Sequence, residues 1–431
     1  MAFDRTDIAE AGRSALAKAS WRLLPLIGLG YGISYIDRLN ISFASLQMNH
    51  DLRFSAAVYG LGAGLFFMSY ALFEVPSNLL LVRFGARRWL ARIMFTWGLL
   101  AAGMLFVRTP LQFYVMRFLL GLAEAGFFPG VIFYLSQWFP AAQRGRAISR
   151  FYVAWPLSAV FMGAIAGTLL GLQGRLGLAG WQWLFLAEGL PAVALSGVIL
   201  FALPDRARDA AWLSEQEKAW IATELAEDGA KHPVGEVRGL RRALLDPIVL
   251  QFGAVNFLLL GAFYAFNFSA PSILKSITNL DVTRVGYLTS GAFLAGAAAM
   301  LLNAWSSDRQ NERFIHLIAP LVLMASAYAV MNLTRSPPLF VGAYVLATAG
   351  YGAVAAVFWL APGEAIHTAA AAAGFAAINA IGQFGSFIST WLWGVASERT
   401  GDFRFGLAVL LSSFCWPRRG CGRFASRRRG N

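Results

Sequence analysis

Long apolar runs, each about the length of a membrane-crossing helix, are the feature that most constrains the fold of this chain. A helix needs roughly 20 mainly apolar residues to cross about 30 Å of hydrocarbon. Runs of that length recur between Arg, Pro and acidic residues along nearly all of the 431 residues. In a bilayer every backbone polar group must be bonded within the protein, so these runs predict transmembrane helices. We therefore expect an all-α membrane protein.

Six spans are expected in each half of the chain. In the first half they cover residues 22–46, 55–82, 89–107, 111–139, 147–171 and 181–203. In the second half they cover residues 247–275, 284–305, 314–333, 337–361, 371–397 and 404–416. The run VYGLGAGLFF at 58–67 is echoed by VGYLTSGAFL at 285–294, a weak repetition expected of a transporter built from related halves. The pattern predicts two pseudo-symmetric six-helix bundles.

Charge predicts the topology rather than a nucleic-acid partner. The chain is 58% hydrophobic with a net charge of +13, and its cations separate apolar runs instead of clustering on one soluble face. Most of the 36 Lys and Arg residues fall on the side of the N-terminus, so the positive-inside rule places both termini in the cytoplasm. We expect a cytoplasmic N-terminus (1–21), a first bundle (22–203), a cytoplasmic linker (204–246), a second bundle (247–416) and a basic tail (417–431).

Two further features bound the prediction. The last apolar run, Phe405 to Trp416, spans only about 18 Å as a helix, so the last helix is expected to be short or truncated. Neither the two cysteines nor the four histidines have metal-ligand spacing, and no nucleophile and base motif or phosphate-binding glycine loop is present. We therefore expect no enzyme activity, no metal and no cofactor.

Ionisable residues inside spans are costly, so each is a functional candidate. Asp37 and Arg38 are neighbours that point about 100° apart on a helix, so each needs a partner elsewhere. Arg117 and Glu124 are seven residues apart, on one helical stripe. A guanidinium can hold a carboxylate, and a buried acid can bind a proton near neutral pH, which suits anion and proton cotransport. The alternative is that these four residues form two structural salt bridges between the first and fourth spans.

Other polar residues in the spans are weaker candidates. We expect Glu74 to bracket the loop arginines near the cytoplasmic end of its span, and Glu188 to be structural. Five aromatic and amide residues could bind a polar substrate or simply pack between helices: Tyr35, Tyr70, Trp359, Asn379 and Gln383.

Several long motifs, spread in order from Trp21 to Gly406, resemble the anion:cation symporter family of the major facilitator superfamily. They are YIDRLNIS, YALFEVPSNLLLVRFGARRW, RFLLGLAEAGFFPGVIFYLSQWFP, GWQWLFLAEGLP and FAAINAIGQFGSF. The family includes carriers for tartrate, phthalate, hydroxyphenylacetate and sugar acids. The resemblance implies a 12-helix major facilitator fold in a bacterial-type inner membrane. It also implies a monomer that imports a small organic anion with protons, driven by the proton gradient.

The resemblance also assigns roles to residues. It implies that Asp37 and Glu124 handle protons, that Arg38 and Arg117 engage the substrate carboxylate, and that Tyr35, Tyr70 and Asn379 line the cavity. The superfamily loop pattern appears as NLLLVRFGAR at 78–87, where Val82 replaces the usual acid, and as AWSSDRQNER at 304–313. These loops imply a cytoplasmic latch between the bundles, formed by Arg83, Arg87, Asp308 and Arg309.

Two rival functions are less compatible with the sequence. A major facilitator antiporter for cations or drugs would have an acidic cavity without paired arginines. A non-transporting anion sensor would need an output domain, and the linker at 204–246 is too short to form one.

Overall fold

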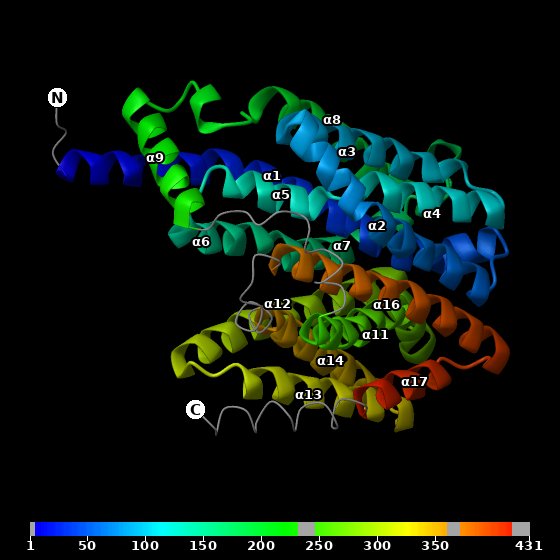
Figure 1. Cartoon of the computed structure of the whole chain (residues 1–431). Coiled ribbons are helices and arrows are strands. Elements are labelled where there is room, and N and C mark those ends of the chain that lie inside the picture. The colour runs from blue at the N-terminus through cyan, green and yellow to red at the C-terminus, as the bar shows by residue number, and fades with distance from the viewer. Residues whose placement is uncertain (1–4, 232–245, 360–370, 416–431) are drawn as a thin grey trace.

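The structure, a computed structural model, describes residues 5–231, 246–359 and 371–415, and the regular elements of those residues are all helices (Figure 1). Before the linker they are α1 (Arg5–Asp51), α2 (Ala56–Phe84), α3 (Ala86–Gly103), η1 (Met104–Phe106), α4 (Pro110–Glu124), α5 (Phe127–Ser136), α6 (Ala141–Tyr152), α7 (Ala154–Leu170), η2 (Arg175–Gly177) and α8 (Gly180–Ala202). The linker holds η3 (Ala207–Asp209) and α9 (Glu215–Lys231). After it come α11 (Pro247–Thr278), α12 (Val282–Gln310), α13 (Phe314–Leu333), α14 (Pro337–Phe358), α16 (Ala371–Thr400) and α17 (Arg404–Cys415). In its described residues, each expected span is occupied by one helix or by two consecutive helices.

The helices form two bundles whose long axes run in roughly the same direction. Figure 1 shows α1 to α8 in the upper bundle and α11 to α17 in the lower one. The N-terminus and α9 lie at one end of the helices, which we call the α9 end. The opposite end, where residues 52–55 connect α1 to α2, is called the far end.

Not every span is equally apolar. In the described part of the chain, 9 helical stretches are long and apolar enough to cross a membrane. The three remaining spans are formed by α1, α16 and α17. Helix α1 carries Asp37 and Arg38 in its central part, and α17 has only 12 residues, as expected of a short last helix. The predicted basic tail (417–431) lies outside the described residues.

The fourth span is broken in the middle of the first bundle, between α4 and α5. Gly126 at the break has a φ of 87°, a left-handed conformation that glycine adopts without strain. A Cβ added there would lie 2.5 Å from the hydroxyl oxygen of Ser77 on α2, so the close approach of α2 also requires glycine. The break makes Glu124 the last residue of α4 and fixes where its carboxylate lies.

The two bundles are sealed against each other in the half of the molecule near the far end. Helix α2 packs on α16 and α7 packs on α12. A Cβ added at Gly163 on α7 would lie 2.8 Å from the carbonyl oxygen of Gly286 on α12, and one at Gly60 on α2 would lie 2.8 Å from a carbonyl oxygen of α16. The Ser290 hydroxyl donates a hydrogen bond to the carbonyl oxygen of Val160 at 2.7 Å. Small residues thus let the backbones touch across this interface.

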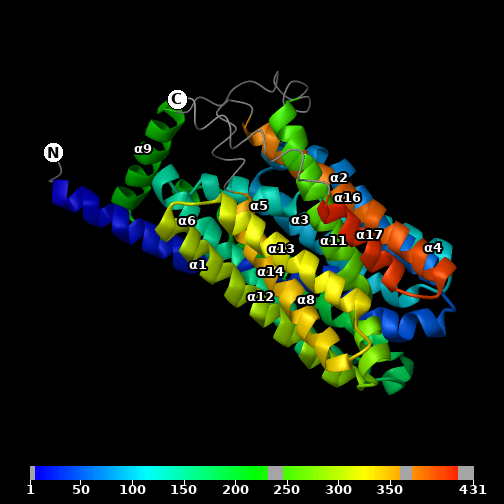
Figure 2. The ribbon, with the colours of Figure 1, turned by 90° about the horizontal axis from the view of Figure 1, so that it is seen from below.

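Helix α9 of the linker packs against the start of α1, and Figures 1 and 2 both show it beside the first turns of α1. Glu217 on α9 accepts hydrogen bonds from Lys18 Nζ at 2.8 Å and from the Ser14 hydroxyl at 2.6 Å. Burial alone would raise the pKa of the Glu217 carboxyl, but these bonds outweigh it and lower the pKa to about 2. The linker is therefore held to the first bundle by a charged contact.

Enlarging Gly286 should open the far end. A leucine there would overpack the contact with Gly163 and destabilise the closed far end by about 1–3 kcal/mol. That corresponds to a roughly ten- to hundredfold increase in the population with the far end open. We expect Gly286→Leu to increase labelling of Ser45→Cys by a membrane-impermeant maleimide in protein whose Cys415 and Cys421 are replaced by serine. Gly291→Leu on the same helix is the matched control, because nothing lies within 4 Å of a Cβ added there. Equal labelling in both variants would contradict the packing argument.

Candidate substrate and proton site

Arg38 on α1 forms a buried ion pair at the boundary between the bundles, with only 5% of its surface exposed. Its guanidinium donates two hydrogen bonds to the same carboxylate oxygen of Glu124, from Nε at 2.9 Å and from Nη2 at 2.6 Å. The other carboxylate oxygen, Oε2, meets no hydrogen-bond donor among the described residues. The pair is a strong charge-assisted contact that leaves one acceptor unused.

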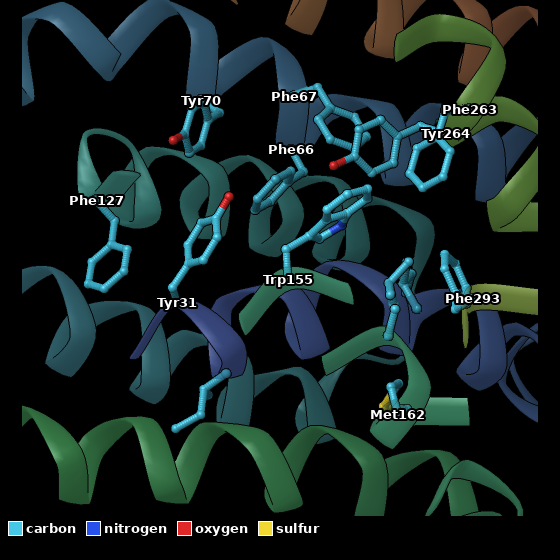
Figure 3. Packing of buried hydrophobic residues seen from close by; sticks show 14 of the residues in the cluster. Tyr31, Phe66, Phe67, Tyr70, Phe127, Trp155, Met162, Phe263, Tyr264 and Phe293 are labelled. Atoms are coloured by element: carbon cyan, nitrogen blue, oxygen red, sulfur yellow. The ribbon is translucent and has the colours of Figure 1, made fainter. Parts of the chain in front are cut away.

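Aromatic rings enclose this ion pair. Three of them lie over the guanidinium carbon, at centroid distances of 4.8 Å for Tyr70, 5.2 Å for Tyr35 and 5.5 Å for Phe66. Tyr264 on α11 faces them from the second bundle, and its ring packs 4.4 Å from that of Phe67 (Figure 3). Each ring face attracts the cation and excludes water from it. The Arg38 group therefore contains residues from both bundles.

Asp37 points into the first bundle instead of toward the bundle boundary, as the 100° step from Arg38 requires. It is fully buried and lies within electrostatic range of Arg117 on α4 and against Glu188 on α8. The amide of Asn40, one turn along α1, donates a hydrogen bond to Glu188. Sequence reasoning expected Glu188 to be structural; in the structure it joins a second charged cluster with Asp37 and Arg117.

Arg117 has an unusual environment for a buried guanidinium. It is 0% exposed, and its three side-chain nitrogens find no hydrogen-bond acceptor in residues 5–231, 246–359 or 371–415. The ring of Phe66 lies 4.9 Å from the guanidinium carbon, which places Arg117 and Arg38 on the same ring. The shared stripe of α4 expected for Arg117 and Glu124 is present, but Glu124 bonds to Arg38.

The expectation that Glu74 brackets loop arginines is wrong. Glu74 is buried, with 5% exposed, and both of its carboxylate oxygens accept hydrogen bonds from the Asn379 amide at 2.9 and 3.0 Å. The contact joins α2 to α16, so it crosses between the bundles. A carboxylate at this depth needs a donor, and the nearest one belongs to the other bundle.

The other two predicted substrate residues on the second bundle are Gln383 and Trp359. Gln383 is buried one turn along α16, and its Oε1 accepts no hydrogen bond from the part of the chain that the structure describes. Trp359 follows the last residue of α14 and packs against Phe358 at 5.3 Å and Phe375 at 6.1 Å. Trp359 is thus placed with aromatic residues of α14 and α16 and not beside Arg38.

Within the described residues, the four residues of the predicted latch contact their own bundle or, for Arg87, the linker. Arg87 pairs with Asp205, with Nε and Oδ2 3.6 Å apart, and its backbone N–H donates to the same carboxylate at 2.8 Å. Asp308 pairs with Arg313 at 2.6 Å. Arg83 and Arg309 lie over the neighbouring rings of Phe84 and Trp305. Asp205 thus supplies to the first loop a carboxylate that is missing at Val82.

Sequence reasoning did not single out Tyr264, Phe66 or Asn40. Asn40 lies three residues after Asp37, so its place on the same face of α1 was a readable signal. Tyr264 and Phe66 lie in aromatic-rich runs where no spacing distinguishes a ring over a cation from a ring in the core.

Comparison with known proteins agrees with this architecture. The family model described as Major Facilitator Superfamily matches residues 27–390. A protein of Agrobacterium vitis named "Putative tartrate transporter" is 42% identical, with 91% of this chain and 90% of that protein aligned. A "Quinolone resistance transporter" of Acinetobacter baumannii is 38% identical, with 92% of each chain aligned.

The fold is also found in a solved structure. The inward-open conformation of the xylose transporter XylE from E. coli superposes with a TM-score of 0.73 at 15% identity, covering 92% of this chain and 94% of that one. The shared fold and the family match over most of the chain point to the same conclusion. This chain belongs to the major facilitator superfamily of membrane transporters.

Proposed function

We propose that the protein imports a small carboxylate-bearing organic anion by proton symport across the bacterial inner membrane. The observation that carries this proposal is the buried Arg38–Glu124 pair at the boundary between the bundles. A relative named for tartrate, at 42% identity, supports an organic acid as the substrate. Tartrate-like acids, sugar acids and aromatic acids all carry the carboxylate that the site requires.

The geometry of the pair suits an exchange of carboxylates. Arg38 directs two N–H groups at one oxygen of Glu124, and a guanidinium fork can hold a substrate carboxylate in the same way. When Glu124 takes up a proton it loses the charge that holds Arg38, which frees the guanidinium for the substrate. Proton binding and anion binding would then favour each other, as symport requires.

Further residues have roles in this proposal. Asp37 is the second proton-binding residue, and Arg117 provides positive charge beside it. Substrate contacts come from the residues named in the sequence and from the ring found in the structure: Tyr35, Tyr70, Trp359, Asn379, Gln383 and Tyr264. The proton gradient supplies the driving force, so the mechanism needs no cofactor.

Transport would proceed by alternating access, in which the bundles rock about the central site. In this conformation the far end is sealed by backbone contacts, and we assign the α9 end to the cytoplasm with both termini. The opposite state would open the far end and bring together the latch residues Arg83, Arg87, Asp308 and Arg309. A monomer is sufficient for this cycle.

A second candidate is export of an aromatic carboxylate drug. The relative named for quinolone resistance, at 38% identity, favours it. So does a run of rings that crosses the bundle boundary beside Tyr35: its ring lies 5.9 Å from that of Trp155, and Trp155 lies 6.0 Å from Tyr351. Export in exchange for protons predicts that acid uptake into vesicles is driven by an outward proton gradient and not by an inward one.

Uptake into proteoliposomes tests the proposal. Labelled tartrate, galactonate, glucarate, phthalate and hydroxyphenylacetate are offered with and without an inward proton gradient. We expect gradient-driven uptake of one acid class, lost in Asp37→Asn and Arg38→Ala and kept in the control Arg284→Ala, whose side chain is exposed. Uptake that ignores the gradient would rule out proton symport, and uptake retained by Arg38→Ala would rule out the carboxylate site.

The Glu74–Asn379 contact gives a separate prediction. Asn379→Leu would leave the buried Glu74 carboxylate without its hydrogen-bond donor, which destabilises this contact by about 1–3 kcal/mol or more. We therefore expect the uptake rate to fall by roughly tenfold. Glu74→Gln keeps a hydrogen bond to Asn379 and should retain most of the rate. The initial rate of uptake measures both variants. The role of this contact would be disproved if Asn379→Leu transported at the rate of the unaltered protein.

A further inference from the structure

We propose that Glu188 shares a single proton with Asp37, so that the proton carried by this transporter is held by a pair of carboxyl groups on α1 and α8. The inference rests on the proposed proton coupling and deepens it, because it assigns a coupling role to a residue that the sequence suggested was structural. The site binds a proton, and its geometry can be tested apart from transport.

The first argument is the contact between the two carboxyl groups. Asp37 and Glu188 lie against each other, and both are almost fully buried, with 0% and 3% exposed. Oε2 of Glu188 accepts a hydrogen bond from Asn40, whereas Oε1 and both oxygens of Asp37 find no donor among the described residues. Ionised carboxylates only accept hydrogen bonds, so the two groups can bond to each other only when one carries a proton.

The second argument is the balance of charge. Arg38 is near Asp37 but is already paired with Glu124, so Arg117 is the arginine left to balance the two acids. With both acids ionised, the Asp37, Glu188 and Arg117 cluster would carry a net negative charge in a dry bundle, which is strongly unfavourable. One proton makes the cluster neutral. The three unpaired nitrogens of Arg117 lie close enough to stabilise the remaining negative charge.

Among the residues that the structure describes, no other charged group near the pair changes this count. Helix α7 has no ionisable residue, α8 has only Glu188, and α3 contributes the neutral indole of Trp97. Arg38 on α1 and Arg117 on α4 face the pair. Tyr59 on α2 and Glu124 on α4 face Arg117 in turn. Arg38 and Glu124 neutralise each other, and a neutral tyrosine adds no charge.

The pair is placed so that substrate binding could change its proton occupancy. Asp37 and Arg38 are adjacent on α1, and Asn40 on the next turn holds Glu188. A shift of α1 when Arg38 exchanges Glu124 for a substrate carboxylate would therefore separate or tighten the two acids. The proton enters from water on the side where the substrate binds and leaves to water where the substrate is released.

A purely structural role for Glu188 makes a different prediction. In that case Glu188 only accepts the Asn40 hydrogen bond that ties α8 to α1, and it stays ionised. Glu188→Gln keeps an acceptor for Asn40 in either case. Only in the shared-proton case does the substitution remove a protonated carboxyl group and fix the charge of the cluster.

Infrared difference spectroscopy of the full-length protein in proteoliposomes, between neutral and alkaline pH, tests the pair without any substrate. We expect a carbonyl band of a protonated carboxyl group that is lost in Glu188→Gln and in Asp37→Asn. The band should remain in Glu215→Gln, a control at an exposed position of α9. A band that persists in Glu188→Gln would overturn the proposal, and Asp37→Asn gives an independent reading if the first variant folds poorly.

Transport assays complete the test. We expect Glu188→Gln to lose gradient-driven accumulation, down to the level seen without a gradient, while it still exchanges labelled for unlabelled acid across the membrane. Accumulation equal to that of the unaltered protein would overturn the coupling role. If the unaltered protein accumulates none of the acids, the proposed function fails, and the infrared band still decides whether the two acids share a proton.

Discussion

A charge inside a membrane protein needs a partner, and the arrangement of helices around α1 follows from that requirement. Arg38 would be very unfavourable in the bundle interior without Glu124, and the break after α4 puts that carboxylate within 2.6 Å. Asp37, on the neighbouring position, meets Arg117 and Glu188 inside the bundle. One turn of α1 thus carries two charge systems, one at the bundle boundary and one behind it.

The interface between the bundles has different kinds of contact near the far end and near the middle of the molecule. Toward the far end the contacts are glycine against backbone, as between Gly163 and Gly286, and hydrogen bonds to carbonyl oxygens. Nearer the middle, Glu74 and Asn379 join the bundles through side chains alone. Side chains can rotate to follow a moving partner, whereas packed backbones separate or touch as a unit. Such an interface favours two discrete arrangements over a continuous deformation.

Much of the fold could be predicted from the sequence because its signal is local. Apolar runs and the charges between them place each helix, and the 12-residue α17 follows from the short last run. The buried charges Asp37, Arg38, Arg117 and Glu124 were recognisable for the same reason, since any charge within a span stands out. The 100° step per residue also predicted that Asp37 and Arg38 would take different partners.

The partners themselves depend on contacts that sequence spacing does not contain. Glu74 was expected near loop arginines because it lies toward the end of its span, yet its donor is Asn379, which is 305 residues away along the chain. Glu188 looked isolated in an apolar helix, and only the packing of α8 on α1 brings it to Asp37. A buried acid therefore takes its role from the helix that packs against it. Helix α1 supplies the partner of two of the buried acids, Arg38 for Glu124 and Asp37 for Glu188, so the movement of one helix can change the surroundings of both acids.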